Sequence, residues 1–358
     1  MARRQVFFFP FVYSFSMGMV LVALPLWALR LKASAVQLGA FGTLLAASIS
    51  LWCVVFGRLS DRVDRPRMMA FGALLASVVM CSVPLFPYIQ WLFVVTALAG
   101  MAGGLYWPAL EAKVAEDSDG EGLAGHLSLF NVGWSSGHAS GALLGGFIMG
   151  QRPEWTFYVT STILLLLSMR ILIGHLSRWK GAGIEDPLMR EEEEHRPKEA
   201  DAFLHIARMG SFAVYFGVAS IRWLFPKLAL SLDIHEGTVG VLIGIMMGAQ
   251  ALMFFLMGRV RVWPYRFEAV LVAQTLPLLG LTLAWVGSSA VGFGAAFCAV
   301  GLGAGMTYTM GLFYSVHGHH AKGSNAGIHE AVAGSGALLG PILGGVLHGV
   351  IRCAHRPS

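Results

Sequence analysis

The feature that most constrains this chain is a series of long apolar stretches separated by short polar ones. Eleven stretches are long enough to cross a bilayer, which takes about 20 helical residues. Their expected limits are 6–29, 36–56, 68–87, 91–112, 123–149, 155–176, 203–230, 238–257, 267–286, 290–313 and 326–350. The stretches are too long and too continuously apolar for barrel strands. We therefore predict an all-α polytopic membrane protein.

The scarcity of charge supports this fold class. Charged residues make up 13% of the chain and hydrophobic residues 56%, whereas a soluble domain carries about 25% charged residues. The net charge of +5 is spread between apolar stretches, so nucleic acid is not an expected partner. Four widely separated cysteines show neither disulfide nor metal-ligand spacing, so no metal or cofactor is expected.

The distribution of lysine and arginine predicts the orientation. If the N-terminus is cytoplasmic, most of these residues fall in the inside loops. The outside loops then contain only Arg30, Lys32, Arg152, Lys227, Arg352 and Arg356. Because cytoplasmic loops carry the excess of basic residues, we predict a multi-pass protein of the inner cell membrane with a cytoplasmic N-terminus.

The longest polar stretch divides the chain. Residues 177–202 include the acidic run Glu191–Glu194 and have the composition of a solvated cytoplasmic linker. We therefore expect an N-terminal six-helix bundle at 1–176 and a C-terminal five-helix bundle at 203–358.

The two halves also repeat in sequence. A shift of 201 residues places Pro25 on Pro226, and the pair Gly57-Arg58 on Gly258-Arg259. A single offset through span ends and loops predicts two similar bundles related by pseudo-twofold symmetry, with a site at their interface.

A charged loop follows the second stretch. It reads Gly57-Arg58-Leu59-Ser60-Asp61-Arg62-Val63-Asp64-Arg65-Pro66-Arg67. This string resembles the signature G-x-L-a-D-r-x-G-r-r/k of the major facilitator superfamily, found between spans 2 and 3. The resemblance implies a secondary transporter in which this loop forms a cytoplasmic gate. Its expected members here are Gly57, Asp61, Arg62, Arg65, Arg67 and, as their partner at the end of span 4, Glu111.

Each gate residue has a physical rationale. Gly57 is expected to let two helices approach closely, and Asp61 to face a helix N-terminus. The arginines are expected to pair with carboxylates, or simply to keep the loop in the cytoplasm. Asp64 stands where the family has glycine, so the turn is expected to differ.

Glycines recur every fourth residue in two stretches. They are Gly137, Gly141 and Gly145 in the fifth, and Gly336, Gly340 and Gly344, with Pro341, in the eleventh. This spacing lines one helical face and permits close backbone contact. The second set resembles the g-x-x-x-G-P-x-x-G-G motif of family exporters, which favours efflux; generic small-residue packing is the alternative.

Polar groups inside the apolar stretches are candidates for substrate or proton binding, because such groups are costly in lipid. Asn131, Trp134 and His138 lie at helical spacing on one face of the fifth stretch. Arg222 is expected to bind an anionic substrate group or to pair with a carboxylate.

Glu330 is the best carboxylate partner for Arg222 by composition, and it follows His329 directly. The pair His329-Glu330 is expected either to couple protons to transport or to pack against the gate.

These features predict a monomeric secondary active transporter that moves a small organic solute across the bilayer by alternating access. Ion-coupled efflux is expected, with protons as the candidate coupling ion, and no enzymatic constellation is found. Family members typically have twelve spans, and here the last is missing. The alternative is therefore a truncated or degenerate carrier that acts as a membrane sensor or assembly partner.

Overall fold

The computed structural model describes residues 3–60, 62–116, 123–176, 199–260, 262–316 and 322–354. The described residues form eleven α-helices, as the apolar stretches predict. They are α1 (Arg3–Arg30), α2 (Ala35–Ser60), α3 (Arg65–Leu85), α4 (Ile89–Glu116), α5 (Leu123–Gln151), α6 (Pro153–Leu176), α7 (Ala200–Ser231), α8 (Glu236–Arg259), α9 (Phe267–Val286), α10 (Ala290–Val316) and α11 (Lys322–Ala354).

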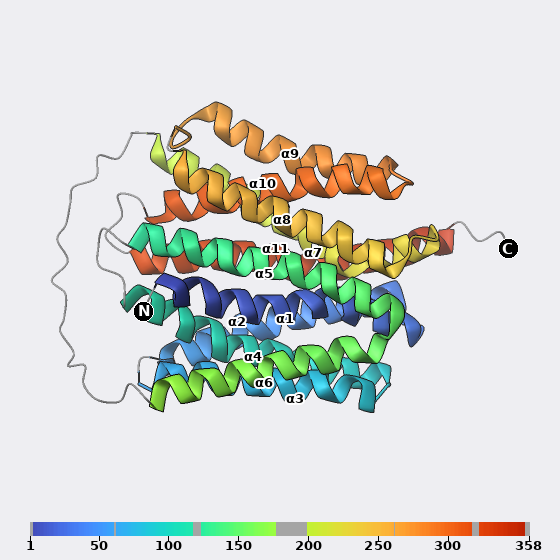
Figure 1. Ribbon diagram of the computed structural model, residues 1–358. Helices are drawn as coiled ribbons and strands as arrows, with labels where there is room; N and C mark the ends of the chain where they lie inside the picture. Colours follow the sequence, from blue (N-terminus) through green and yellow to red (C-terminus); the bar gives the residue numbers. More distant parts are fainter. Residues whose placement is uncertain are drawn as a thin grey trace.

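Ten of these helices are long and apolar enough to cross a membrane, judged on the described residues. Helix α5 does not meet this criterion of length and hydropathy over its described residues, although it runs beside the other helices in Figure 1. Its apolar pattern is interrupted by polar groups such as Asn131, Ser135 and His138. These groups are tolerated because α5 packs between α1 and α8, so that neighbouring helices shield it.

The helices lie roughly parallel and define two ends of the bundle (Figure 1). We call the end where α1 begins the N-side, and the opposite end, where α1 joins α2 and α11 terminates, the C-side. The links from α2 to α3 and from α8 to α9 lie at the N-side, whereas those from α1 to α2 and from α7 to α8 lie at the C-side.

The sequence repeat appears as equivalent helix contacts. In the first half α5 packs along α1, and in the second half α11 packs along α7. A Cβ added at Gly137 would lie against the Phe11 carbonyl oxygen, and one added at Gly336 against the Phe212 carbonyl oxygen. Phe11 and Phe212 differ by the same 201 positions as Pro25 and Pro226. The architecture is therefore two related helical bundles.

The predicted glycine stripes are confirmed as backbone contacts. The faces that carry Gly141 and Gly340 meet the carbonyl oxygens of Phe15 and Phe216. Because side chains larger than glycine would collide with these backbones, the stripes fix how α5 and α11 sit on α1 and α7.

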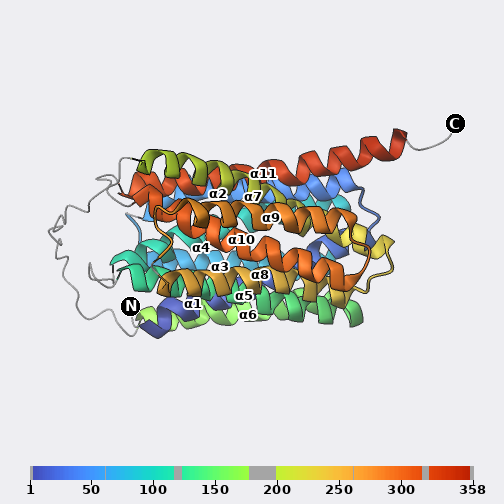
Figure 2. The same cartoon turned by 90° about the horizontal axis from the view of Figure 1, so that it is seen from above.

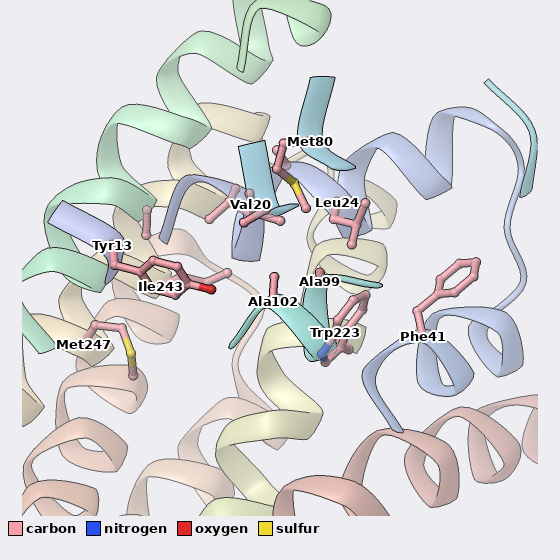
Figure 3. Close-up of a cluster of buried hydrophobic side chains, with 14 of the residues drawn as sticks. Tyr13, Val20, Leu24, Phe41, Met80, Ala99, Ala102, Trp223, Ile243 and Met247 are labelled. Atoms are coloured by element: carbon pink, nitrogen blue, oxygen red, sulfur yellow. The ribbon is translucent and has the colours of Figure 1, made fainter. Parts of the chain in front are cut away.

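The interface between the halves is formed by α2 with α11 and by α5 with α8. Figure 2 shows α2 beside α11 along one edge and α5 beside α8 along the other. Buried side chains from both halves meet between them, including Tyr13, Trp223 and Met247 (Figure 3). The predicted linker and its acidic run lie outside the described residues apart from 199–202, so the bundle limits stay a prediction.

Candidate functional site: a polar path between the two halves

The C-side is closed by an ion pair between the halves. Arg30 at the end of α1 donates from Nη2 to Glu236 Oε2 at 2.8 Å and from Nε to Oε1 at 3.3 Å. The same Nη2 reaches the Met149 carbonyl oxygen of α5 at 3.3 Å. One guanidinium thus ties α1, α5 and α8 together.

Close backbone contacts lie just inside this ion pair. A Cβ added at Gly39 of α2 would collide with the Pro341 carbonyl of α11. One added at Gly240 of α8 would lie 2.6 Å from the Ala142 carbonyl oxygen of α5. The Thr43 hydroxyl also donates to the Leu338 carbonyl oxygen at 2.6 Å. The Gly39 and Gly240 contacts are the same contact, repeated by the pseudo-symmetry.

The same helix pairs separate towards the N-side. A Cβ added at Gly334 of α11 would be 3.7 Å from the Ser50 hydroxyl of α2. One added at Gly248 of α8 would be 3.9 Å from Ala139 of α5. These are ordinary van der Waals distances, so the closest backbone contacts of these helix pairs lie towards the C-side, whereas further along α5 the Ser135 hydroxyl donates to the Met247 carbonyl oxygen at 3.1 Å.

A cavity of about 200 Å³ lies between the halves, bounded by α1, α2, α7 and α11. Its polar lining consists of Arg222 of α7, the neighbouring indole of Trp223 and Ser50 of α2. The Arg222 Nη2 lies 2.9 Å from the Met247 sulfur of α8, and Nε is buried without a hydrogen-bond partner. Arg222 and Glu330 form no ion pair among the described residues, and Glu330 accepts a hydrogen bond from Tyr308 instead.

Aromatic rings continue from Arg222 towards the N-side. The Trp134 ring of α5 lies 5.5 Å from Phe254 of α8 and 6.4 Å from Tyr308 of α10, between ring centroids. Tyr308 lies 6.0 Å from Tyr215 of α7. Four helices from both halves thus contribute to one aromatic cluster.

The three polar residues predicted on α5 interact partly with one another. Trp134 Nε1 donates to Asn131 Oδ1 at 3.0 Å. The His138 ring nitrogen Nδ1 lies 3.0 Å from the Trp134 carbonyl oxygen. Asn131 therefore orients the indole, while His138 interacts electrostatically with Arg222.

Glu330 lies at the N-side limit of the cluster. Its Oε1 accepts a hydrogen bond from the Tyr308 hydroxyl at 2.5 Å, and the residue is exposed. Glu111 of α4 is exposed as well and interacts electrostatically with Glu330. Glu111 thus interacts with an acid of the other half, and its pairing with the gate arginines stays a prediction.

We call Arg222, the aromatic cluster and Glu330 together the polar path. His329 is not part of it. Its side chain is fully buried, both ring nitrogens lack a hydrogen-bond partner, and the ring packs on Tyr308 at 5.0 Å. It also lies against Gly311 of α10. The geometry favours packing for His329, and it separates His329 from Glu330 although the two are neighbours in sequence.

The gate loop is partly described. Asp61 lies outside the described residues, and Arg62 lies exposed in the loop. Arg65 donates to the Ser60 carbonyl oxygen at 3.3 Å and to the Ala112 carbonyl oxygen at 3.5 Å, so it links the loop to α4. The close helix approach predicted at Gly57 is not found, because a Cβ there would meet only Pro108, at 3.9 Å.

Asp64 takes a defined role where the family pattern has glycine. Its Oδ1 accepts a hydrogen bond from the Arg67 backbone N–H at 3.1 Å, and Pro66 follows in the first turn. Asp64 is therefore the N-cap of α3.

Sequence reasoning missed three contributors. Arg30 was counted only as a flanking charge, and its partner Glu236 is 206 residues away. The bond between Tyr308 and the Glu330 carboxyl is not indicated by any motif in the sequence. A search for acidic residues in the same predicted outside loops as the basic ones would have identified Glu236, which lies close to Asp233 in the sequence.

Comparison with known proteins agrees with this geometry. The family model of the Major Facilitator Superfamily matches residues 6–205. The multi-drug resistance efflux pump PmrA of Streptococcus pneumoniae is 24% identical over 63% of this chain. The uncharacterized MFS-type transporter YhjO of Bacillus subtilis is 24% identical over 31% of it. The matched region spans 57% of the length of PmrA.

Solved structures show the same fold. A bacterial homologue of the human lysosomal transporter Spinster, in an inward-facing and occupied conformation, has a TM-score of 0.77 at 13% identity and covers 98% of this chain and 83% of its own. The nucleoside transporter NupG has a TM-score of 0.68 at 13% identity, and covers 97% of this chain and 91% of its own. With the family model matching more than half of the residues, the chain belongs to the Major Facilitator Superfamily.

Proposed function

We propose that this transporter exports a small organic solute by alternating access, in exchange for protons. The observation that carries the proposal is the asymmetry of the interface between the halves. Tight contacts gather at the C-side around Arg30–Glu236, whereas the acids Glu111 and Glu330 are exposed towards the N-side. Such an arrangement is expected of a carrier whose cavity is open at one end.

The lysine and arginine distribution supports placing the N-side in the cytoplasm. The conformation is then inward-facing, with the polar path accessible from the cytoplasm. In this state a solute enters past Glu111 and Glu330 and meets the aromatic cluster and Arg222. The name of the pneumococcal relative, a multi-drug resistance efflux pump, favours export as the direction.

The change to an outward-facing state requires both ends to rearrange. At the C-side, the Arg30–Glu236 pair and the Gly39 contact with Pro341 must separate. At the N-side, α4 and α11 must approach, which brings the carboxyls of Glu111 and Glu330 together. Two ionised carboxylates oppose this approach, so a proton shared between them favours closure of the N-side.

In the part of the chain that the structure describes, the titratable groups that interact with Glu330 come from four helices. They are Tyr308 of α10, Tyr215 of α7, Cys53 of α2 and Glu111 of α4. Among these, only Glu111 is a second carboxyl. Glu330 is therefore assigned as the proton carrier, with Tyr308 holding its carboxyl in place.

A proton-flux assay tests the proposal. Everted membrane vesicles that contain the chain are acidified inside, and the loss of the pH gradient is followed while a panel of amphipathic solutes is added. The proposal expects at least one solute to discharge the gradient with the unaltered chain and not with Glu330→Gln. If no solute discharges it, the alternative of a non-transporting carrier is favoured.

A further inference from the structure

Arg222 presents a positive charge to the cavity without a counter-charge. Among the described residues no carboxylate lies within 4.0 Å of it, and its nearest acceptor is the neutral sulfur of Met247 at 2.9 Å. Nε is buried and has no hydrogen-bond partner. An unneutralised guanidinium in a low-dielectric site is costly, so this group is suited to a negative group of the solute.

Glu330 is a negative group without a cationic partner, the counterpart of Arg222. Its carboxyl accepts a hydrogen bond from Tyr308, and its charged neighbour is another acid, Glu111. No lysine or arginine lies within ion-pair distance of it in the part of the chain that the structure describes. Glu330 is therefore suited to a proton or to a positive group of the solute.

The space between these charges is aromatic. Tyr215 shares α7 with Arg222, and its ring lies 6.0 Å from Tyr308, which donates to Glu330. Arg222 and Tyr215 are two turns apart on α7, which corresponds to about 10 Å along the helix. The rings of Trp134, Phe254 and Tyr308 pack in one cluster beside Tyr215.

We infer that the solute is a zwitterion with an aromatic body, its anionic group held by Arg222 and its cationic group by Glu330. This inference rests on the proposed function and adds the chemical class of the solute. A purely anionic solute would leave Glu330 unmatched and be repelled by it when ionised. A purely cationic solute would leave Arg222 without a counter-charge. A body with stacked rings fits the spacing, and Trp134 and Tyr308 offer faces for it and for an adjacent ammonium group.

The same geometry explains exchange with protons. A cationic group on Glu330 and a proton on Glu330 occupy the same oxygens and exclude one another. Binding of solute therefore releases a proton, and binding of a proton releases solute. This mutual exclusion is the condition for antiport, and hence for export against a concentration difference.

Equilibrium binding to the purified full chain tests the inference with one family of probes. The zwitterion is 4′-(aminomethyl)biphenyl-4-carboxylic acid, whose two rings hold its charges roughly 10 Å apart, no closer than the two-turn spacing that already separates Arg222 from Tyr215 on α7. Its N-acetyl derivative keeps only the carboxylate, and its carboxamide keeps only the ammonium group. Each binding constant is measured by equilibrium dialysis at neutral pH. The zwitterion is expected to bind roughly 10- to 100-fold more tightly than either singly charged probe.

Variants assign each charge to its residue. Arg222→Gln is expected to bind zwitterion and carboxamide equally, because the carboxylate has lost its partner. Glu330→Gln is expected to bind zwitterion and N-acetyl derivative equally. Arg222→Lys keeps the positive charge and is expected to keep part of the preference for the zwitterion over the carboxamide. Arg152→Gln and Glu268→Gln, at exposed positions away from the cavity, are the matched controls and leave the order of the probes unchanged.

Comparison of the three probes on the unaltered chain needs no variant, so the test holds even where Arg222→Gln does not fold. Equal binding of all three probes would overturn the inference, and so would an equal loss for all probes in Arg222→Gln. Because dialysis requires no transport, a zwitterion preference without solute-driven proton flux would support this inference and contradict the proposed function. Solute-driven proton flux without a preference for the zwitterion would support the proposed function and contradict this inference.

Discussion

Arg30 and Glu236 form an ion pair through two nitrogen atoms of one guanidinium, with a shortest N···O distance of 2.8 Å, across the C-side of the two halves. Arg30 ends a helix of the first half, and Glu236 begins a helix of the second. The pair is accessible to solvent on the arginine side, where 43% of the side chain is exposed. It is therefore a closure that can open at moderate cost, which suits a carrier that alternates between two states.

Removing this pair should shift the equilibrium between the states. Arg30→Gln is expected to weaken C-side closure by about 1 kcal/mol, which changes the ratio of the two states about fivefold. The measurement is the labelling rate of a cysteine placed at Ala35, which is buried against Gly345 of α11 at the closed end, and labelling is expected to be faster in Arg30→Gln. The charge-reversed double variant Arg30→Glu with Glu236→Arg should restore slow labelling, and failure to do so would argue against the pair.

Proton coupling at Glu330 makes a second prediction. Glu330→Gln is expected to remove the pH dependence of solute flux, because the amide neither binds nor releases a proton. Tyr308→Phe should keep the dependence but shift its midpoint, since the hydroxyl stabilises the ionised carboxylate. Flux is measured in proteoliposomes across pH 5 to 9 or so, with Glu268→Gln as the control. Retained pH dependence in Glu330→Gln would remove Glu330 from this role.

The glycine contacts predict position-specific effects on folding. Gly141→Val and Gly340→Val place a branched side chain against a carbonyl oxygen of the neighbouring helix, and should destabilise by about 1–3 kcal/mol each. Gly57→Val, whose nearest neighbour is 3.9 Å away, is the control and should retain stability. Thermal unfolding of the detergent-purified variants measures the order of their stabilities. Equal losses at all three positions would contradict the packing described for α5 and α11.

The N-cap of α3 gives a fourth prediction. Asp64→Ala removes the oxygen that accepts from the Arg67 N–H, and is expected to cost about 1 kcal/mol. Asp64→Gly, which restores the family residue, should cost only a few tenths of that amount by the same ranking. Thermal unfolding under identical conditions compares the two. A larger loss for glycine than for alanine would contradict the capping role.

The elements that sequence predicted best are those that depend on local pattern. Apolar stretches gave the eleven helices because lipid selects length and hydropathy residue by residue. The offset from Pro25 to Pro226 indicated equivalent helix contacts because both halves descend from one arrangement. The stripes at Gly141 and Gly340 were predictable because close helix contact requires small residues at fixed spacing.

The parts that sequence could not supply depend on distance in space. Nothing local in the chain connects Arg30 with Glu236, which are 206 positions apart. Composition suggested that Glu330 pairs with Arg222, but α10 places Tyr308 next to Glu330 instead. His329 and Glu330 looked alike in sequence, yet one helical step turns His329 into the core and Glu330 towards the N-side.

The central claim is that the two halves tilt against each other around the polar path, so that one end opens as the other closes. Two spin-labelled pairs test it by distance measurement in nanodiscs. Val36 with Leu232 reports the C-side, and Val63 with Val262 reports the N-side; all four positions are exposed. On acidification we predict that the C-side pair lengthens while the N-side pair shortens. Distances that stay fixed at both ends, or that change in the same direction, would contradict the account.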